Sequence, residues 1–122
     1  MKNSSKSITS RIAFTAASHL QDVFADRVRF RADACDDYKA VELAFPGLKI
    51  KGSTSYCAVK VGTRSVYLTA IEFFGAGLPK LCIYSEDLNI RYTEYFSQTK
   101  LNSAVARVVE IVDQIEGNKA AA

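Results

Sequence analysis

The side chains that could do covalent or metal chemistry are few. His19 is the single histidine, and Cys35, Cys57 and Cys82 are the three cysteines. Cys57 and Cys82 fall in apolar, strand-like stretches, and Cys35 falls at a predicted turn with Asp36-Asp37. A nucleophilic cysteine needs a polar, partly exposed site that stabilises its thiolate. No CxxC pair exists, and one histidine cannot complete the usual zinc ligand sets with these thiols unless carboxylates join it. We therefore expect reduced, mostly buried thiols, and neither a metal nor another cofactor.

An acidic stretch raises the alternative of a metal-dependent nuclease. The last three positions of such a nuclease pattern are an acidic residue, any residue and a lysine, and Asp37-Tyr38-Lys39 matches them. Asp26 lies upstream. A site of this kind holds Mg²⁺ on carboxylates and places a lysine beside the scissile phosphate. A three-residue match is common by chance, and Asp36-Asp37 is typical of a turn. The nuclease is therefore the least favoured hypothesis, and we expect no catalytic residue.

The most distinctive residues are basic and aromatic side chains along the predicted strands. Cations of this kind bind phosphates and tyrosine rings stack on bases in proteins that bind single-stranded nucleic acid. Tyrosine and arginine are also enriched in the hot spots of protein interfaces. The alternative is a solvated face with no partner, because a half-exposed strand needs polar residues on its outer side. The candidate partner-binding residues are Arg27, Arg29, Arg31, Lys49, Lys51, Tyr56, Lys60 and Arg64.

Charge is distributed in blocks of alternating sign. The chain of 122 residues has a net charge of +3; residues 1–31 and 47–80 are net positive, and residues 32–46 and 81–122 are net negative. A protein that binds double-stranded DNA through counterion release is usually more basic. Blocks of opposite sign favour an oriented encounter with a complementary protein partner. The charge pattern therefore permits nucleic-acid contact on one face without requiring it.

Two segments near the chain ends have the apolar spacing of amphipathic helices. The first predicted helix runs from about Lys6 to Ala25, and His19 falls on its apolar stripe as a core or boundary residue. The second starts at a cap formed by Ser97 or Thr99, and Gly117 is a natural stop for it. The predicted stripe of the first helix is Ile8, Ile12, Ala16, Leu20, Val23 and Phe24, and that of the second is Leu101, Val105, Val108, Ile111, Val112 and Ile115.

Between the two helices the apolar period changes to that of strands. Pro46-Gly47 and Gly62-Thr63-Arg64 are predicted turns, and the second of them joins a candidate hairpin. Short links between successive strands require antiparallel neighbours, because a parallel return needs a dozen or more residues. The predicted strands cover residues 27–32, 40–45, 48–51, 56–61, 65–74, 80–85 and 89–96.

The sequence thus predicts one α+β domain over residues 1–122, with residues 1–5 and 118–122 frayed. Its fold class is an antiparallel β-sheet meander of five to seven strands, flanked by N- and C-terminal helices packed on one face. The opposite sheet face is expected to be open to solvent or to a partner. The 48% content of apolar residues is that of a globular protein.

The expected function is that of a non-enzymatic binding protein that occupies a surface of a partner macromolecule. A protein partner is favoured, as for an adaptor or an inhibitor encoded by a phage or another mobile element and aimed at a host protein or ribonucleoprotein complex. The alternative is a single-stranded nucleic-acid-binding protein, and a homodimer is a further option. No apolar run approaches the ~20 residues that cross a bilayer, and the N-terminal residues lack the features of a signal peptide. We therefore expect a cytoplasmic protein without a membrane partner.

Overall fold

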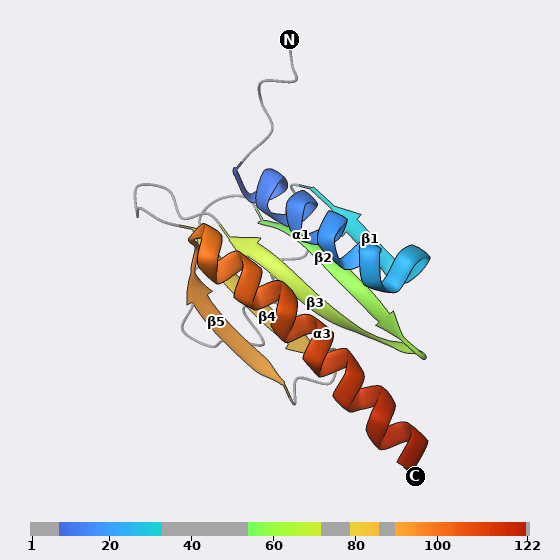
Figure 1. The fold of residues 1–122 in the computed structure, drawn as a ribbon. Coiled ribbons are helices and arrows are strands. Elements are labelled where there is room, and N and C mark those ends of the chain that lie inside the picture. Colours follow the sequence, from blue (N-terminus) through green and yellow to red (C-terminus); the bar gives the residue numbers. More distant parts are fainter. Residues whose placement is uncertain (1–7, 33–53, 72–78, 86–89, 122) are drawn as a thin grey trace.

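The computed structural model describes residues 8–32, 54–71, 79–85 and 90–121, with side chains described up to residue 117. Two long helices and five strands follow each other along these ranges (Figure 1). A short 3₁₀ turn joins the first helix to the first strand. The elements are α1 (Ile8–Phe24), η2 (Ala25–Arg27), β1 (Val28–Arg31), β2 (Thr54–Val61), β3 (Arg64–Ile71), β4 (Lys80–Ser85), β5 (Arg91–Tyr95) and α3 (Gln98–Ala121).

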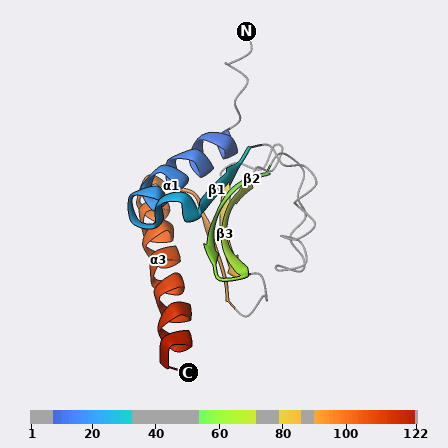
Figure 2. The same cartoon turned by 90° about the vertical axis from the view of Figure 1, so that its right-hand side faces the viewer.

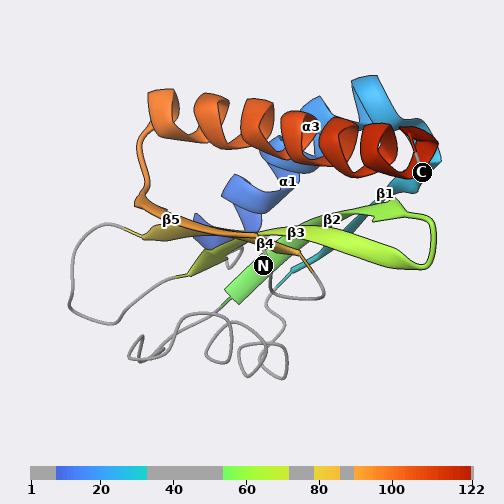
Figure 3. The same cartoon turned by 90° about the horizontal axis from the view of Figure 1, so that it is seen from below.

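The strands form one antiparallel sheet in the order β1-β2-β3-β4-β5. Both helices lie against the same face of this sheet (Figures 2 and 3). The predicted α+β meander with flanking helices is therefore confirmed. The β2–β3 hairpin turns at Gly62, whose φ of 65° is the positive value that the first central residue of a type II′ turn requires. The strands predicted at residues 40–45 and 48–51 lie outside the described residues.

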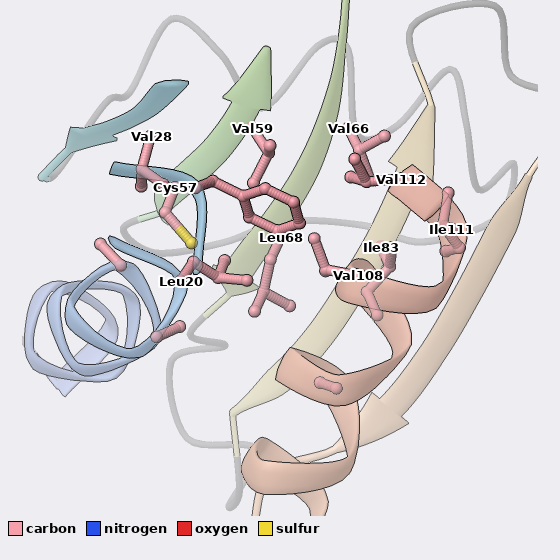
Figure 4. Packing of buried hydrophobic residues seen from close by; sticks show 14 of the residues in the cluster. Leu20, Val28, Cys57, Val59, Val66, Leu68, Ile83, Val108, Ile111 and Val112 are labelled. Atoms are coloured by element: carbon pink, nitrogen blue, oxygen red, sulfur yellow. The ribbon is translucent and has the colours of Figure 1, made fainter. Parts of the chain in front are cut away.

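The core lies between the helices and the sheet (Figure 4). Leu20 of α1, Leu68 at the centre of β3 and Val108 of α3 are fully buried in this core. Because α1 and α3 also contact each other, the two helices and the sheet share one apolar cluster. Its members include Ile12, Ala16, Leu20, Phe24, Val28, Cys57, Val59, Val66, Leu68, Leu81, Ile83, Leu101, Ala104, Val108, Ile111 and Val112.

The stripe predicted for α1 is correct at its centre and wrong at two positions. Ile12, Ala16 and Leu20 are buried, but His19 is exposed and Val23 is 58% exposed. His19 lies at the margin of the buried arc, and Val23 lies in the last turn of the helix. Apolar spacing reports the direction in which a side chain projects, but it does not report how far along the helix the packing surface extends.

The second helix begins as predicted and ends later than predicted. The backbone N–H of Lys100 donates to Ser97 Oγ at 3.1 Å, which makes Ser97 the cap. Gly117 does not stop α3, which continues to Ala121. A helical glycine is less favourable than alanine by only about 1 kcal/mol, so neighbouring turns can extend through it. In the described part of the chain, neither helix is long and apolar enough to cross a membrane.

Candidate partner-binding surface

The antiparallel register assigns each strand residue to the helix-covered face or to the opposite face, which we call the far face. Val59, Leu68 and Ile83 face the helices, so their alternating neighbours Ala58, Tyr67 and Tyr84 share the far face. Arg29 is opposite Ala58, and Arg31 is opposite Tyr56. The far face therefore carries the arginines of β1 at one edge and a set of tyrosines across its centre.

The tyrosines at the centre of the far face contact each other. The Tyr67 and Tyr84 rings are stacked at 5.1 Å between centroids and 11° between planes, and Tyr56 meets Tyr67 edge-on at 5.3 Å. Tyr84 is only 4% exposed. Tyr67 and Tyr84 therefore stack on each other, and the buried Tyr84 does not present a free ring face to a base.

The prediction of an open far face is wrong at its centre. Ala58, Thr69 and Cys82 are as buried there as residues of the helix-facing core. Strand alternation divides side chains between two faces, but it does not determine whether a face is covered. Exposed far-face residues are instead found near the edges of the sheet: Arg29 and Arg31 on β1, Lys60 on the neighbouring β2, and Tyr95 on β5.

Arg27 differs from the other predicted binding residues because its side chain has a structural role. Its Nη2 donates to Glu116 Oε2 of α3 at 2.8 Å, and its Nε donates to the carbonyl oxygen of Lys60 at 3.0 Å. The guanidinium also lies 5.1 Å from the ring centroid of Phe24. Arg27 thus ties the end of α1 to β2 and α3, and Glu116 neutralises its charge.

A depression of about 370 Å³ brings together four of the predicted basic residues. It lies where β1 and the β2–β3 turn meet, and we call it the basic depression. Arg31 and Tyr56 form a neighbouring cross-strand pair outside it. Lys49 and Lys51 lie outside the described residues. The basic depression is lined by Asp26, Arg27, Arg29, Lys60, Thr63, Arg64 and Ser65.

A pair of exposed phenylalanines beside β1 was not predicted. Phe14 of α1 is 60% exposed and Phe30 of β1 is 38% exposed, and their rings meet edge-on at 5.6 Å. Phe14 could have been found from the sequence, because it lies off the apolar stripe of its helix, where an exposed aromatic residue has no role in the core. Phe30 projects from the helix-covered side of β1, whereas Arg29 and Arg31 project from its far face. The four side chains therefore flank the edge of the described sheet from its two sides, and we call them the β1-edge surface.

The buried thiols behave as core residues. Burial raises the pKa of Cys57 to about 12 and that of Cys82 to about 11, although the hydroxyl of Thr93 at 3.6 Å from Cys82 Sγ opposes the second shift. Both are free thiols and are buried as expected. A thiol with so high a pKa holds almost no thiolate near neutral pH, so it is a poor nucleophile.

The other predicted chemical groups do not form a site that the structure describes. Across residues 8–32, 54–71, 79–85 and 90–117, no three histidine, cysteine or acidic side chains are placed to hold a metal ion. Cys35 and the Asp37-Tyr38-Lys39 pattern lie outside the described residues, so the nuclease hypothesis stays a prediction. Comparison with known proteins found no family model, curated protein or solved structure that matches this chain.

Proposed function

We propose that this chain is a binding protein that occupies an acidic and partly apolar surface of a partner protein through its β1-edge surface. The observation that carries the proposal is the exposed Phe14–Phe30 pair at the edge strand β1, whose other face carries the exposed Arg29 and Arg31. Fully burying an exposed phenylalanine side chain contributes roughly 1.5–3 kcal/mol. Phe14 is 60% exposed and Phe30 is 38% exposed, so the pair together can bury about as much area as one fully exposed ring. Two adjacent rings therefore supply a substantial part of the binding energy that an adaptor or an inhibitor needs.

The position of this surface on β1 favours a foreign partner over a second copy of the chain. β1 is an edge strand of the described sheet, with β2 on one side. An antiparallel pairing of two β1 strands would place arginines near arginines, and like charges opposite each other destabilise a strand pair. A partner with acidic side chains instead meets Arg29 and Arg31 with complementary charge.

The nucleic-acid alternative has less support than the protein-binding one. It relies on tyrosine rings that stack on bases, and Tyr67 and Tyr84 stack on each other. The exposed aromatic residues at the β1 edge are Phe14 and Phe30, and their rings contact each other edge to face. Such a compact pair is better suited to a pocket on a protein than to a series of successive bases.

The test is affinity capture from a lysate of the cells that make the protein, with and without nuclease. We expect a partner protein to be retained in stoichiometric amount after nuclease treatment. The double variant F14A/F30A should weaken capture at least about tenfold, because truncating an interface hot spot has effects of this size. Charge reversal by Arg31→Glu should weaken capture and make the remainder less sensitive to salt.

The matched control is V23A/Y95A, which removes two side chains that are 58% and 55% exposed elsewhere on the molecule. This variant should capture the partner as well as the native chain does. Capture that survives F14A/F30A unchanged would contradict the proposed surface. Loss of all retained material on nuclease treatment would instead favour the nucleic-acid alternative.

A further inference from the structure

The basic depression has a composition that the proposed protein interface does not explain. Its lining contains four cationic side chains and one carboxylate, that of Asp26. Two hydroxyl groups, those of Thr63 and Ser65, complete its polar lining. Its volume of about 370 Å³ falls in the range of sites for small ligands. Positive charge and hydroxyl donors in one concave site favour an anion.

Two of the four cations are available for such an anion. Arg29 and Lys60 are exposed and form no ion pair with any residue that the structure describes. Arg27 is held by Glu116, so its charge is largely compensated. Even with Asp26 and Glu116 counted against the four cations, an excess of positive charge remains around the depression.

The strands that carry these groups are held in place by contacts already described. Lys60 is paired with Ser65 across the β2–β3 hairpin, one step from the tight turn at Gly62. The Nε of Arg27 bonds the carbonyl oxygen of Lys60 and thereby fixes the end of β2 against η2. Arg29 enters from β1, which is paired with β2 along its whole length. The segment η2, the strand β1 and the β2–β3 hairpin thus hold the hydrogen-bond donors of the basic depression close together.

A second depression on the described surface gives a comparison for the first. It encloses about 300 Å³ between α3 and β5 and has two cations and one carboxylate in its lining, which consists of Ile90, Arg91, Arg107, Glu110, Ile111 and Gln114. Arg107 lies 3.8 Å from Glu110 and 5.8 Å from the ring centroid of Tyr92, so its charge already has partners. This second depression supplies a matched control for the first.

We propose that the basic depression binds a phosphate dianion, either free phosphate or the phosphate of a phosphate monoester. The second pKa of a phosphate monoester is about 6, so the group carries nearly two negative charges at neutral pH. Coulomb attraction scales with this charge, and a dianion is therefore preferred over a singly charged phosphodiester. Arg29 supplies a planar guanidinium, Lys60 an ammonium group, and Thr63 and Ser65 hydroxyl donors to the phosphate oxygens.

The test is an NMR titration of the purified full chain with inorganic phosphate at pH 7.5, with the ionic strength held constant by chloride. We expect saturable shifts of the backbone amides of Arg29, Lys60, Thr63 and Arg64. A parallel titration with O-phosphoserine distinguishes a free phosphate from a phosphorylated side chain: tighter binding of O-phosphoserine assigns the site to a phosphorylated side chain, and equal binding assigns it to free phosphate.

Substitutions separate binding in the depression from general attraction to a basic protein. Arg29→Gln and Lys60→Gln should each weaken phosphate binding at least about tenfold, because each removes a charge-assisted hydrogen bond. Arg107→Gln removes a cation from the second depression and should leave the affinity unchanged. Asp26→Asn should strengthen binding roughly twofold to fivefold by removing a repulsive charge, a gain that structural damage would not produce.

Three results would overturn this proposal. The first is a set of amide shifts that rise linearly with phosphate concentration and do not saturate. The second is a loss of phosphate affinity in Arg107→Gln equal to that in Arg29→Gln or Lys60→Gln. The third is displacement of phosphate by a single-stranded oligonucleotide at a lower concentration of phosphate groups than O-phosphoserine requires. The proposed protein interface is tested separately. F14A/F30A should leave phosphate binding intact. Lys60 is not part of the β1-edge surface, so Lys60→Gln should leave capture of the protein partner intact. Either proposal can therefore fail without the other.

Discussion

At the scale of single residues, Thr69 has an unfavourable environment. Its side chain lies on the far face of β3 between Tyr56 and Cys82, and it is 1% exposed. Its hydroxyl has no hydrogen-bond partner among the residues that the structure describes. Burying a hydroxyl without a partner opposes folding, because the group gives up hydrogen bonds to water and gains none in return.

Thr69→Val should therefore stabilise the protein. Valine keeps the branched shape of threonine and removes the unsatisfied hydroxyl, so we expect the free energy of unfolding to rise by about 1 kcal/mol. Urea denaturation followed by circular dichroism measures this change. Thr93→Val on β5 is the control and should give no gain, because Thr93 is exposed and its hydroxyl contacts Cys82. A clear loss of stability in Thr69→Val would contradict this account.

The two buried thiols give a prediction about pH and reactivity. In a Cys35→Ser background, Cys57 and Cys82 should react with a disulfide reagent far more slowly in the native protein at pH 8 than in urea. Their native pKa values of about 12 and 11 leave almost no thiolate at this pH. Fast native labelling of either thiol would contradict the burial described here.

The same pKa shifts predict that the protein becomes less stable at alkaline pH. The folded-state pKa values are higher than the ordinary value of 9.0, so the folded state holds these protons more tightly than the unfolded state. The contribution of these protonated thiols to the free energy of unfolding is fully present below about pH 9 and is lost as the pH rises toward 11 to 12. Cys57→Ala should reduce this loss in an alkaline unfolding series, compared with the Cys35→Ser background alone.

At the scale of elements, the end of α1 determines how the chain enters the sheet. Ala25 follows the last residue of α1 and has a φ of 53°, a left-handed conformation that L side chains disfavour. Two residues later, Arg27 contacts Phe24, β2 and α3. A left-handed residue ends the helix and redirects the chain, and the arginine fixes the direction in which β1 leaves.

Ala25→Gly should stabilise this helix end. Glycine adopts the left-handed conformation without strain but has more freedom in the unfolded chain, so we expect a net gain of about 0.5–1 kcal/mol. Ala25→Val should lower the free energy of unfolding, because branching at Cβ makes this φ less favourable. Thermal unfolding of both variants checks the prediction, and opposite signs at one position are its signature. Destabilisation by both substitutions would contradict it.

At the scale of the whole molecule, one apolar cluster joins both helices to all the central strands. The cluster contains Leu20 of α1, Leu68 of β3, Ile83 of β4 and Val108 of α3. Helices and strands that share a core in this way are expected to unfold together in a domain of this size. The binding surfaces proposed above lie outside this cluster, at the β1 edge and at the β2–β3 turn.

Leu20→Ala should consequently destabilise the whole domain and not α1 alone. Truncating a fully buried leucine lowers the free energy of unfolding by about 2–5 kcal/mol. Hydrogen exchange should show the loss of protection in β3 and β4 as well as in α1. Val23→Ala in the same helix removes an exposed side chain and should change stability by no more than about 0.5 kcal/mol. Loss of protection confined to α1 would show that the helix is an independent unit.

The sequence by itself determined the helices, the hairpin at Gly62 and the antiparallel meander, because apolar period, caps and link lengths act over a few neighbouring residues. It also identified Arg29, Lys60 and Arg64 as candidate binding residues, but it did not predict that they surround one depression or that Glu116 neutralises Arg27. Tertiary structure alone decided that Tyr67 and Tyr84 stack on each other and that Phe14 meets Phe30 at the surface. These outcomes depend on contacts between residues far apart in the chain, and local patterns carry no information about such contacts.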